Sequence, residues 1–156
     1  VVNLGLGGRT MLKNGDCSYW NEPEFKYALD SDADKVILML GTNDAKKFQW
    51  NESAFRSDYL EMARLLLEIQ SKPELFIMTP PPLYDDFPEF KKGIINERFP
   101  ELIREIANEL GLPKKNVINT FEALGGPNLT EYQFFCDGQN CCGCHPNDAG
   151  YSRIAS

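Results

Sequence analysis

The hydrophobic positions of the chain fall into short apolar runs and longer stripes with helical spacing. Lys35–Leu40 and Leu75–Thr79 are runs of strand length, and continuous runs of this kind are typical of parallel strands that are buried on both faces. Between Ser53 and Gln70 apolar side chains recur every three or four residues, which predicts a helix with one core-facing stripe. The stripe consists of Phe55, Tyr59, Met62, Ala63, Leu66 and Ile69.

The flanking sequence continues this alternation of strands and helices. Val1–Leu4 predicts a short strand that leads into a glycine turn, and Glu22–Leu29 predicts a short helix with a proline in its first turn. Leu102–Leu110 predicts a second amphipathic helix, which ends at a glycine. The rest consists of a short strand at Val117–Asn119, a loop-like segment at 122–145 and the first turns of a helix from Tyr151.

Strands that alternate with helices indicate βαβ units and a parallel sheet with right-handed crossovers. We therefore expect an α/β fold with a three-layer, flavodoxin-like parallel sheet, in one domain that covers residues 1–156. In such sheets ligands bind at the carboxyl ends of the strands. The functional residues should accordingly follow the strands directly.

The charge balance restricts the partners that the protein can have. Sixteen Lys and Arg residues against 23 Asp and Glu give a net charge of -7, in a chain with 42% hydrophobic residues. This acidic balance argues against nucleic acids and anionic membrane surfaces as partners. No apolar run approaches the ~20 residues that a membrane span needs. We expect neither nucleic-acid binding nor a membrane span, and the oligomeric state stays open.

Polar and glycine residues gather where the predicted strands end. Residues 3–10 read Asn-x-Gly-x-x-Gly-x-Thr, residues 41–44 read Gly-Thr-Asn-Asp, and residues 145–147 read His-Pro-Asn. The first motif is no dinucleotide fingerprint, because Thr10 stands where that pattern needs its last glycine. Each motif alone is a weak signal, whereas the set in this order is a specific one.

These motifs hold the groups that ester hydrolysis requires. The backbone N–H of Gly8 and the side-chain amide of Asn43 can both donate to the oxyanion of a tetrahedral intermediate, where one donor contributes roughly 2.7–4 kcal/mol. His145 is the only histidine of the chain and can act as the general base for a serine. Plainer alternatives are a simple glycine turn, a helix N-cap at Asn43 and a structural histidine.

Taken together, the motifs resemble those of the SGNH (GDSL-type) esterase family over nearly the whole chain. The resemblance implies acyl transfer through a covalent acyl-enzyme, with His145 as base and then acid, Gly8 and Asn43 as oxyanion donors, and neither cofactor nor metal. The substrate would be a small-molecule or carbohydrate ester. The wording of the motifs looks most like the branch that deacetylates carbohydrates, including sialate O-acetylesterase-like proteins.

Two positions depart from the family pattern. The family's nucleophile is the serine of a Gly-Asp-Ser motif upstream of the first motif here, and this chain contains no Gly-Asp-Ser; its Gly-Asp-Cys at residues 15–17 lies in the wrong order. The family also places an aspartate three residues before the histidine, where this chain has Cys142. A thiol is a weak acceptor, which leaves Asp137 as the substitute acid.

The resemblance also predicts that one strand is missing from the sheet. In the family order 2-1-3-4-5 the serine strand lies between the first two strands of this chain. Val1–Leu4 and Val36–Leu40 should then lie too far apart to pair, at roughly 9–10 Å instead of the ~4.8 Å of neighbours. We expect a domain that is truncated at both ends, and any targeting segment would be invisible.

Four of the five cysteines, at positions 136, 141, 142 and 144, are crowded before the histidine. A disulfide-pinned loop in an oxidising compartment is the interpretation that we favour, and the sequons at Asn51 and Asn128 fit a secreted protein. A zinc site of Cys136, Cys141, Cys144 and His145 is the alternative. Besides the esterase, two functions stay open: a non-catalytic carbohydrate-binding pseudoesterase, and a zinc- or thiol-dependent domain built on these cysteines.

Overall fold

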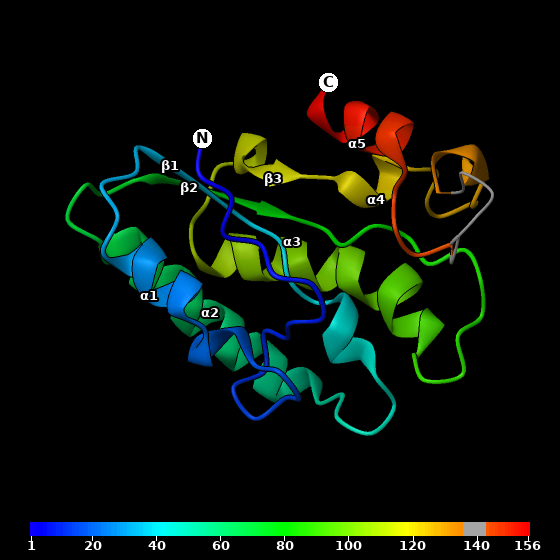
Figure 1. The fold of residues 1–156 in the computed structure, drawn as a ribbon, viewed down its shortest axis with the longest axis horizontal. Coiled ribbons are helices and arrows are strands. Elements are labelled where there is room, and N and C mark those ends of the chain that lie inside the picture. The colour runs from blue at the N-terminus through cyan, green and yellow to red at the C-terminus, as the bar shows by residue number, and fades with distance from the viewer. Residues whose placement is uncertain (136–142) are drawn as a thin grey trace.

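The core of the protein is a parallel three-stranded sheet in the order β1-β2-β3. The computed structural model describes residues 1–135 and 143–156, and Figure 1 shows the arrangement of the elements. The strands are β1 (Lys35–Leu38), β2 (Glu74–Met78) and β3 (Val117–Ile118). Val36 pairs with Leu75 and Ile77 with Val117. The parallel α/β architecture predicted from the sequence is therefore confirmed.

Helices connect the strands and continue beyond the last one. The α-helices are α1 (Pro23–Leu29), α2 (Glu52–Glu68), α3 (Phe99–Glu109), α4 (Thr120–Ala123) and α5 (Asp148–Ala155). The shorter turns are η1 (Tyr19–Asn21), η2 (Thr42–Ala45), η3 (Ile94–Arg98), η4 (Lys114–Asn116) and η5 (Tyr132–Phe134), of which η3 is a π-helical turn. Among the described helices, none combines the length and apolar character needed to cross a bilayer.

The predicted amphipathic helices form where the sequence indicated. Helix α2 begins at Asn51, whose side chain accepts a hydrogen bond from the backbone N–H of Ala54, and its apolar stripe is buried. Helix α3 ends at Gly111, which takes the left-handed φ of +69° that glycine adopts without strain. The sequence pattern predicts a loop for the segment 122–145. In the structure α4 extends into the start of this segment and turn η5 lies within it.

Helices α2 and α3 pack against each other and against β2, and Figure 1 shows them with α1 on one side of the sheet. Two successive right-handed crossovers that proceed in the same direction place both helices on the same face. The contact is aromatic: the ring centroids of Phe55 and Phe99 are 5.1 Å apart, and Trp50 meets Phe99 edge-on at 5.2 Å. These contacts lie in the main hydrophobic core.

The two predictions for the first strands are corrected by the structure. Lys35–Leu40 is not buried on both faces, since Ile37 is 62% and Met39 is 41% exposed. Val1–Leu4 is not a strand, and Val1 and Val2 are exposed. In the described residues β1 pairs only with β2, so no further strand lies beside β1. Val1–Leu4 pairs with no strand and therefore forms none. The two segments do not pair, as expected, whereas their spacing stays a prediction.

Candidate active site

The segment that follows β1 turns sharply at Gly41. This residue has a φ of +141°, and a Cβ atom there would lie 3.2 Å from the side chain of Pro80 and 3.4 Å from the ring of Phe99. Only glycine fits such a crowded, left-handed position. The turn leads into η2, which carries Asn43 and Asp44 at the carboxyl edge of the sheet.

Asn43 is held against the glycine-rich loop of residues 5–9. Its Nδ2 donates a hydrogen bond to the carbonyl oxygen of Arg9 at 3.2 Å, and its own carbonyl oxygen accepts one from Gln49 at 2.8 Å. The N-cap of η2 is Gly41, so the alternative of Asn43 as a helix cap is wrong. Within residues 1–135 and 143–156, the second N–H of the Asn43 amide has no acceptor.

Gly8 directly precedes Arg9 and takes a φ of +78°. Its backbone N–H donates to no acceptor among residues 1–135 and 143–156. The Arg9 guanidinium holds the turn, because it donates to the carbonyl oxygen of Gly7 at 2.9 Å and pairs with Glu22 at 2.6 Å. The Glu22 hydrogen bond raises the pKa of Arg9. The hydrogen bond from Asn43 to the Arg9 carbonyl oxygen thus ties the amide to the residue that follows Gly8. The joint action of Gly8 and Asn43 as oxyanion donors stays a prediction.

Asp44 is a residue of this site that the sequence reasoning missed. Its carboxylate is fully buried and accepts hydrogen bonds from the backbone N–H groups of Met11 at 3.0 Å and Leu12 at 2.7 Å. Burial raises the pKa of Asp44 to about 7, although both hydrogen bonds oppose this shift. The carboxyl group ties the loop of the first motif to the edge of the sheet. Its place beside Asn43 in the Gly-Thr-Asn-Asp motif was the available signal.

His145 lies in the loop that precedes α5, and its side chain is exposed. The backbone N–H of Tyr84, which follows β2, donates to the carbonyl oxygen of Gly143 at 2.8 Å. Asn147 donates from its side chain to the carbonyl oxygen of Gln133 at 2.7 Å and caps α5 by accepting from Gly150 at 3.0 Å. His145 therefore belongs to the same edge of the sheet as Gly8 and Asn43. No contact in the described residues joins it to them, so the convergence of all three stays a prediction.

Several predicted residues lie outside the described part of the chain. Asp137 and Cys142, the candidate acid and the residue in its usual place, fall in the segment 136–142, as do Cys136 and Cys141. The choice between a disulfide and a zinc site rests on these residues. Within residues 1–135 and 143–156, no three His, Cys, Asp or Glu side chains are grouped as a metal site would need.

The Gly-Asp-Cys-Ser segment at residues 15–18 does not supply a nucleophile in the manner of the family. Cys17 is exposed and has a φ of +51°, whereas Ser18 is 3% exposed and sits in the bridge to Thr10. The Ser18 hydroxyl is enclosed and has no hydrogen-bond partner in the described structure. A substrate cannot reach it. The burial of Ser18 agrees with the interpretation that this segment is a coincidence of sequence, which stays a prediction.

The parallel α/β fold and the three motifs are those of a GDSL-type domain. The sequence pattern of the GDSL-like Lipase/Acylhydrolase family matches residues 1–153, and the chain belongs to this family. It is 29% identical over 173 aligned residues to an acetylxylan esterase from Xylanibacter ruminicola. The alignment covers 99% of this chain and 34% of that relative. The chain thus spans about a third of the length of the curated relative that it matches.

Two solved structures share the fold of this chain at low sequence identity. A protein of Agrobacterium tumefaciens assigned as an arylesterase has a TM-score of 0.67 at 24% identity, over 96% of this chain and 72% of the other. A peptidoglycan O-acetylesterase has a TM-score of 0.66 at 19% identity, over 85% of this chain and 37% of the other. At this identity the likeness shows the fold alone, and it confirms the α/β architecture of the family.

Proposed function

We propose that the protein hydrolyses carboxylic esters and that its substrates are O-acetylated carbohydrates. The observation that supports the proposal is the hydrogen bond from Asn43 to the carbonyl oxygen of Arg9, because it ties the amide donor to the residue that follows Gly8. The Gly8 N–H has no acceptor among the described residues. Two preorganised donors at the carboxyl edge of a parallel sheet are what the oxyanion of an acyl-transfer intermediate needs. Membership of the acylhydrolase family supports the same reaction.

The residues of this chain would contribute to the reaction as follows. His145 takes the proton of a serine hydroxyl as the serine oxygen attacks the acyl carbon, then gives that proton to the leaving alcohol. The same histidine activates water for hydrolysis of the acyl-enzyme. Gly8 and Asn43 donate to the oxyanion of both intermediates, and Asp137 orients the imidazole. The serine itself would come from a Gly-Asp-Ser segment, which this chain does not contain.

The substrate class and location are supported by resemblance and by sequence features. One relative is an acetylxylan esterase and one structural neighbour is a peptidoglycan O-acetylesterase, and both names denote the removal of acetyl groups from carbohydrate polymers. Such polymers lie outside the cell, and the sequons at Asn51 and Asn128 agree with secretion. We therefore place the activity on the extracellular side, in one hydrolase domain that includes residues 1–156.

Release of p-nitrophenol from p-nitrophenyl acetate tests the proposal. The 156-residue chain should remain at the background rate, because it has no positioned nucleophile. The whole product of its gene should hydrolyse the ester, and His145→Ala should lower kcat by about 10²–10⁴-fold, the usual contribution of a general base. Serine-dependent turnover by the 156-residue chain itself would contradict the assignment of the nucleophile.

A carbohydrate-binding pseudoesterase is the competing function, and the cysteine at position 142 in place of the usual acid favours it. Such a protein would keep the pocket and bind acetylated sugars, yet its whole gene product would leave the ester at the background rate. The same assay therefore decides between the two functions. Deacetylation of O-acetylated xylan, followed by acetate release, then establishes the substrate of the active protein.

A further inference from the structure

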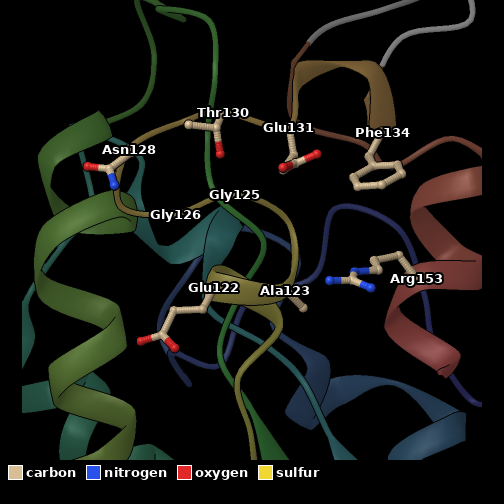
Figure 2. Close-up of a pocket in the computed structure, with 9 residues that line it drawn as sticks. All are labelled: Glu122, Ala123, Gly125, Gly126, Asn128, Thr130, Glu131, Phe134 and Arg153. Atoms are coloured by element: carbon tan, nitrogen blue, oxygen red, sulfur yellow. The ribbon is translucent and has the colours of Figure 1, made fainter.

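A pocket of about 220 Å³ lies beside α4, η5 and α5, and none of the candidate catalytic residues lines it. Its volume is below the roughly 300–1,000 Å³ of pockets for drug-sized ligands, so it suits a smaller group. Figure 2 shows the side chains around it. The polar and aromatic ones are Glu122, Asn128, Thr130, Glu131, Phe134 and Arg153.

The loop that forms one wall of this pocket is fixed in place. The buried hydroxyl of Tyr84 donates to the carbonyl oxygen of Leu124 at 2.8 Å and accepts from the backbone N–H of Glu131 at 2.8 Å. It therefore fastens both ends of the loop 124–131. Gly125 within the loop has a φ of +92°, and a Cβ atom there would collide with the Tyr84 hydroxyl. The shape of this wall exists before any ligand arrives.

The opposite wall is fastened to the loop that carries His145. The backbone N–H of Asn147 donates to the carbonyl oxygen of Phe134 at 2.8 Å, and Gly150 packs so closely on the same oxygen that a Cβ atom would not fit. These contacts position η5 against α5 and thereby set Phe134 beside Arg153. Since Asn147 is two residues from His145, the pocket and the candidate catalytic loop share a rigid connection.

The polar groups in the pocket have unused hydrogen-bonding capacity. The guanidinium of Arg153 forms no ion pair, and the hydroxyl of Thr130 forms no hydrogen bond, within the described residues. Figure 2 shows Arg153 reaching from α5 to a place below the Phe134 ring, with the Thr130 hydroxyl directed toward Gly125. Glu131 accepts a hydrogen bond from Gln133 at 2.6 Å and keeps further acceptor capacity, because a carboxylate has about four lone-pair sites.

The pocket is lined by both an arginine and carboxylates, and this combination favours an uncharged polar ligand. An anion would pair with Arg153 but would meet the carboxylate of Glu131, and a cation would meet the guanidinium; the Glu122 carboxylate is paired with Arg104 at 3.7 Å. A sugar hydroxyl both accepts and donates, so it satisfies Arg153 and Glu131 at once, and the Phe134 ring offers an apolar surface to the C–H groups of the sugar. Resting on the proposed function, we infer that this pocket binds one uncharged sugar unit of the carbohydrate chain, apart from the unit whose ester is hydrolysed.

Titration of the ¹⁵N-labelled protein with unacetylated xylotetraose tests the inference without any reaction. The backbone amides of Gly125, Thr130 and Glu131 should shift. Arg153→Ala should weaken binding about tenfold, since the loss of a hydrogen bond to a charged group changes an equilibrium by roughly that factor. Thr130→Val, which keeps the shape and removes the hydroxyl, should weaken it less. Arg64→Ala, an arginine on α2 with 57% side-chain exposure, is the matched control and should leave binding unchanged.

Three results would overturn the inference: no shifts, an affinity of Arg153→Ala equal to that of the native protein, or tighter binding of an oligogalacturonate than of the neutral sugar. The two proposals fail in different ways. Failure of the proposed function leaves sugar binding intact while the whole gene product does not hydrolyse p-nitrophenyl acetate. Failure of the present inference leaves that hydrolysis intact while binding of the sugar does not depend on Arg153.

Discussion

The carboxyl group of Asp44 is fully buried, yet it is the acceptor that holds residues 11 and 12 against the sheet. Its pKa of about 7 lies above the ~3.9 of an unfolded aspartate. Between these values the folded state retains a proton that the unfolded state has released, so the contribution to stability is complete below pH ~4 and is lost as the pH rises through 7.

We therefore expect the free energy of unfolding to fall by about 3 kcal/mol between pH 5 and pH 8 on account of this group. Urea unfolding at several pH values measures the slope. Asp44→Asn should have a lower stability but a flatter slope, because the amide does not titrate. Asp30→Asn, at an exposed position, should keep the native slope. Equal slopes in the native protein and in Asp44→Asn would contradict this account.

The contacts of Asn43 predict an effect on the rate of ester hydrolysis. Removal of its amide in Asn43→Ala should lower kcat for p-nitrophenyl acetate by about 10²–10³-fold with little change in KM, as for other oxyanion donors. The assay uses the whole gene product. Asn14→Ala removes an exposed amide from the same neighbourhood and should have native kinetics. A rate within a few fold of native for Asn43→Ala would exclude the residue from the reaction.

At the scale of elements, the π-helical turn η3 is joined to the loop after β2 by one side chain. Asn96 accepts from the backbone N–H of Leu83 and donates to its carbonyl oxygen, both at 2.8 Å. Leu83 precedes Tyr84, which holds both the pocket loop and the loop of His145. The turn η3 therefore supports two functional loops from a distance.

Replacement of this side chain in Asn96→Ala leaves two backbone groups of Leu83 without partners. We expect the free energy of unfolding to fall by about 2–3 kcal/mol, and the amide hydrogens of Tyr84 and its neighbours to exchange faster. Asn108→Ala, on the exposed side of α3, should change the free energy of unfolding by no more than ~0.5 kcal/mol. It should leave the exchange of the Tyr84 amide hydrogen unchanged. Unchanged exchange at Tyr84 in Asn96→Ala would show that the loop is held by other contacts.

The elements also show which parts of the fold a sequence can predict. The stripe of α2 and the glycine stop of α3 are local patterns, and both were predicted correctly. The exposure of Ile37 depends on which strands and helices lie beside β1, which no local pattern contains. The burial of Asp44 depends on N–H groups 32 and 33 residues away in sequence. The motifs of Gly8 and Asn43 can be found in the sequence because they directly follow apolar runs, while the role of both residues in the reaction stays a prediction.

At the scale of the whole molecule, β1 is the edge of the described sheet, and Ile37 and Met39 are exposed there. An edge strand with unpaired backbone groups and apolar side chains favours association with other chains. We expect the 156-residue chain to self-associate in sedimentation velocity as its concentration rises. Ile37→Lys should reduce this association without lowering the melting temperature, because the side chain is already 62% exposed.

Tyr27→Lys is the matched control, since Tyr27 is an apolar residue with 58% exposure on α1, away from the sheet edge. This variant should associate like the native chain. Equal association in Ile37→Lys and in the native chain would place the contact elsewhere on the surface.

The hydrogen bond from Asn43 to the Arg9 carbonyl also has a stereochemical consequence. An amide carries two N–H hydrogens, and because one is engaged by Arg9 the other keeps a single direction. In the proposed hydrolysis this donor fixes the direction of the carbonyl oxygen, so the planar acyl carbon presents one face to the attacking oxygen. The resulting tetrahedral carbon bears four different groups and forms with one handedness. Of two mirror-image phosphonate esters that imitate it, only one presents its oxygen to Asn43 while its leaving group points to His145.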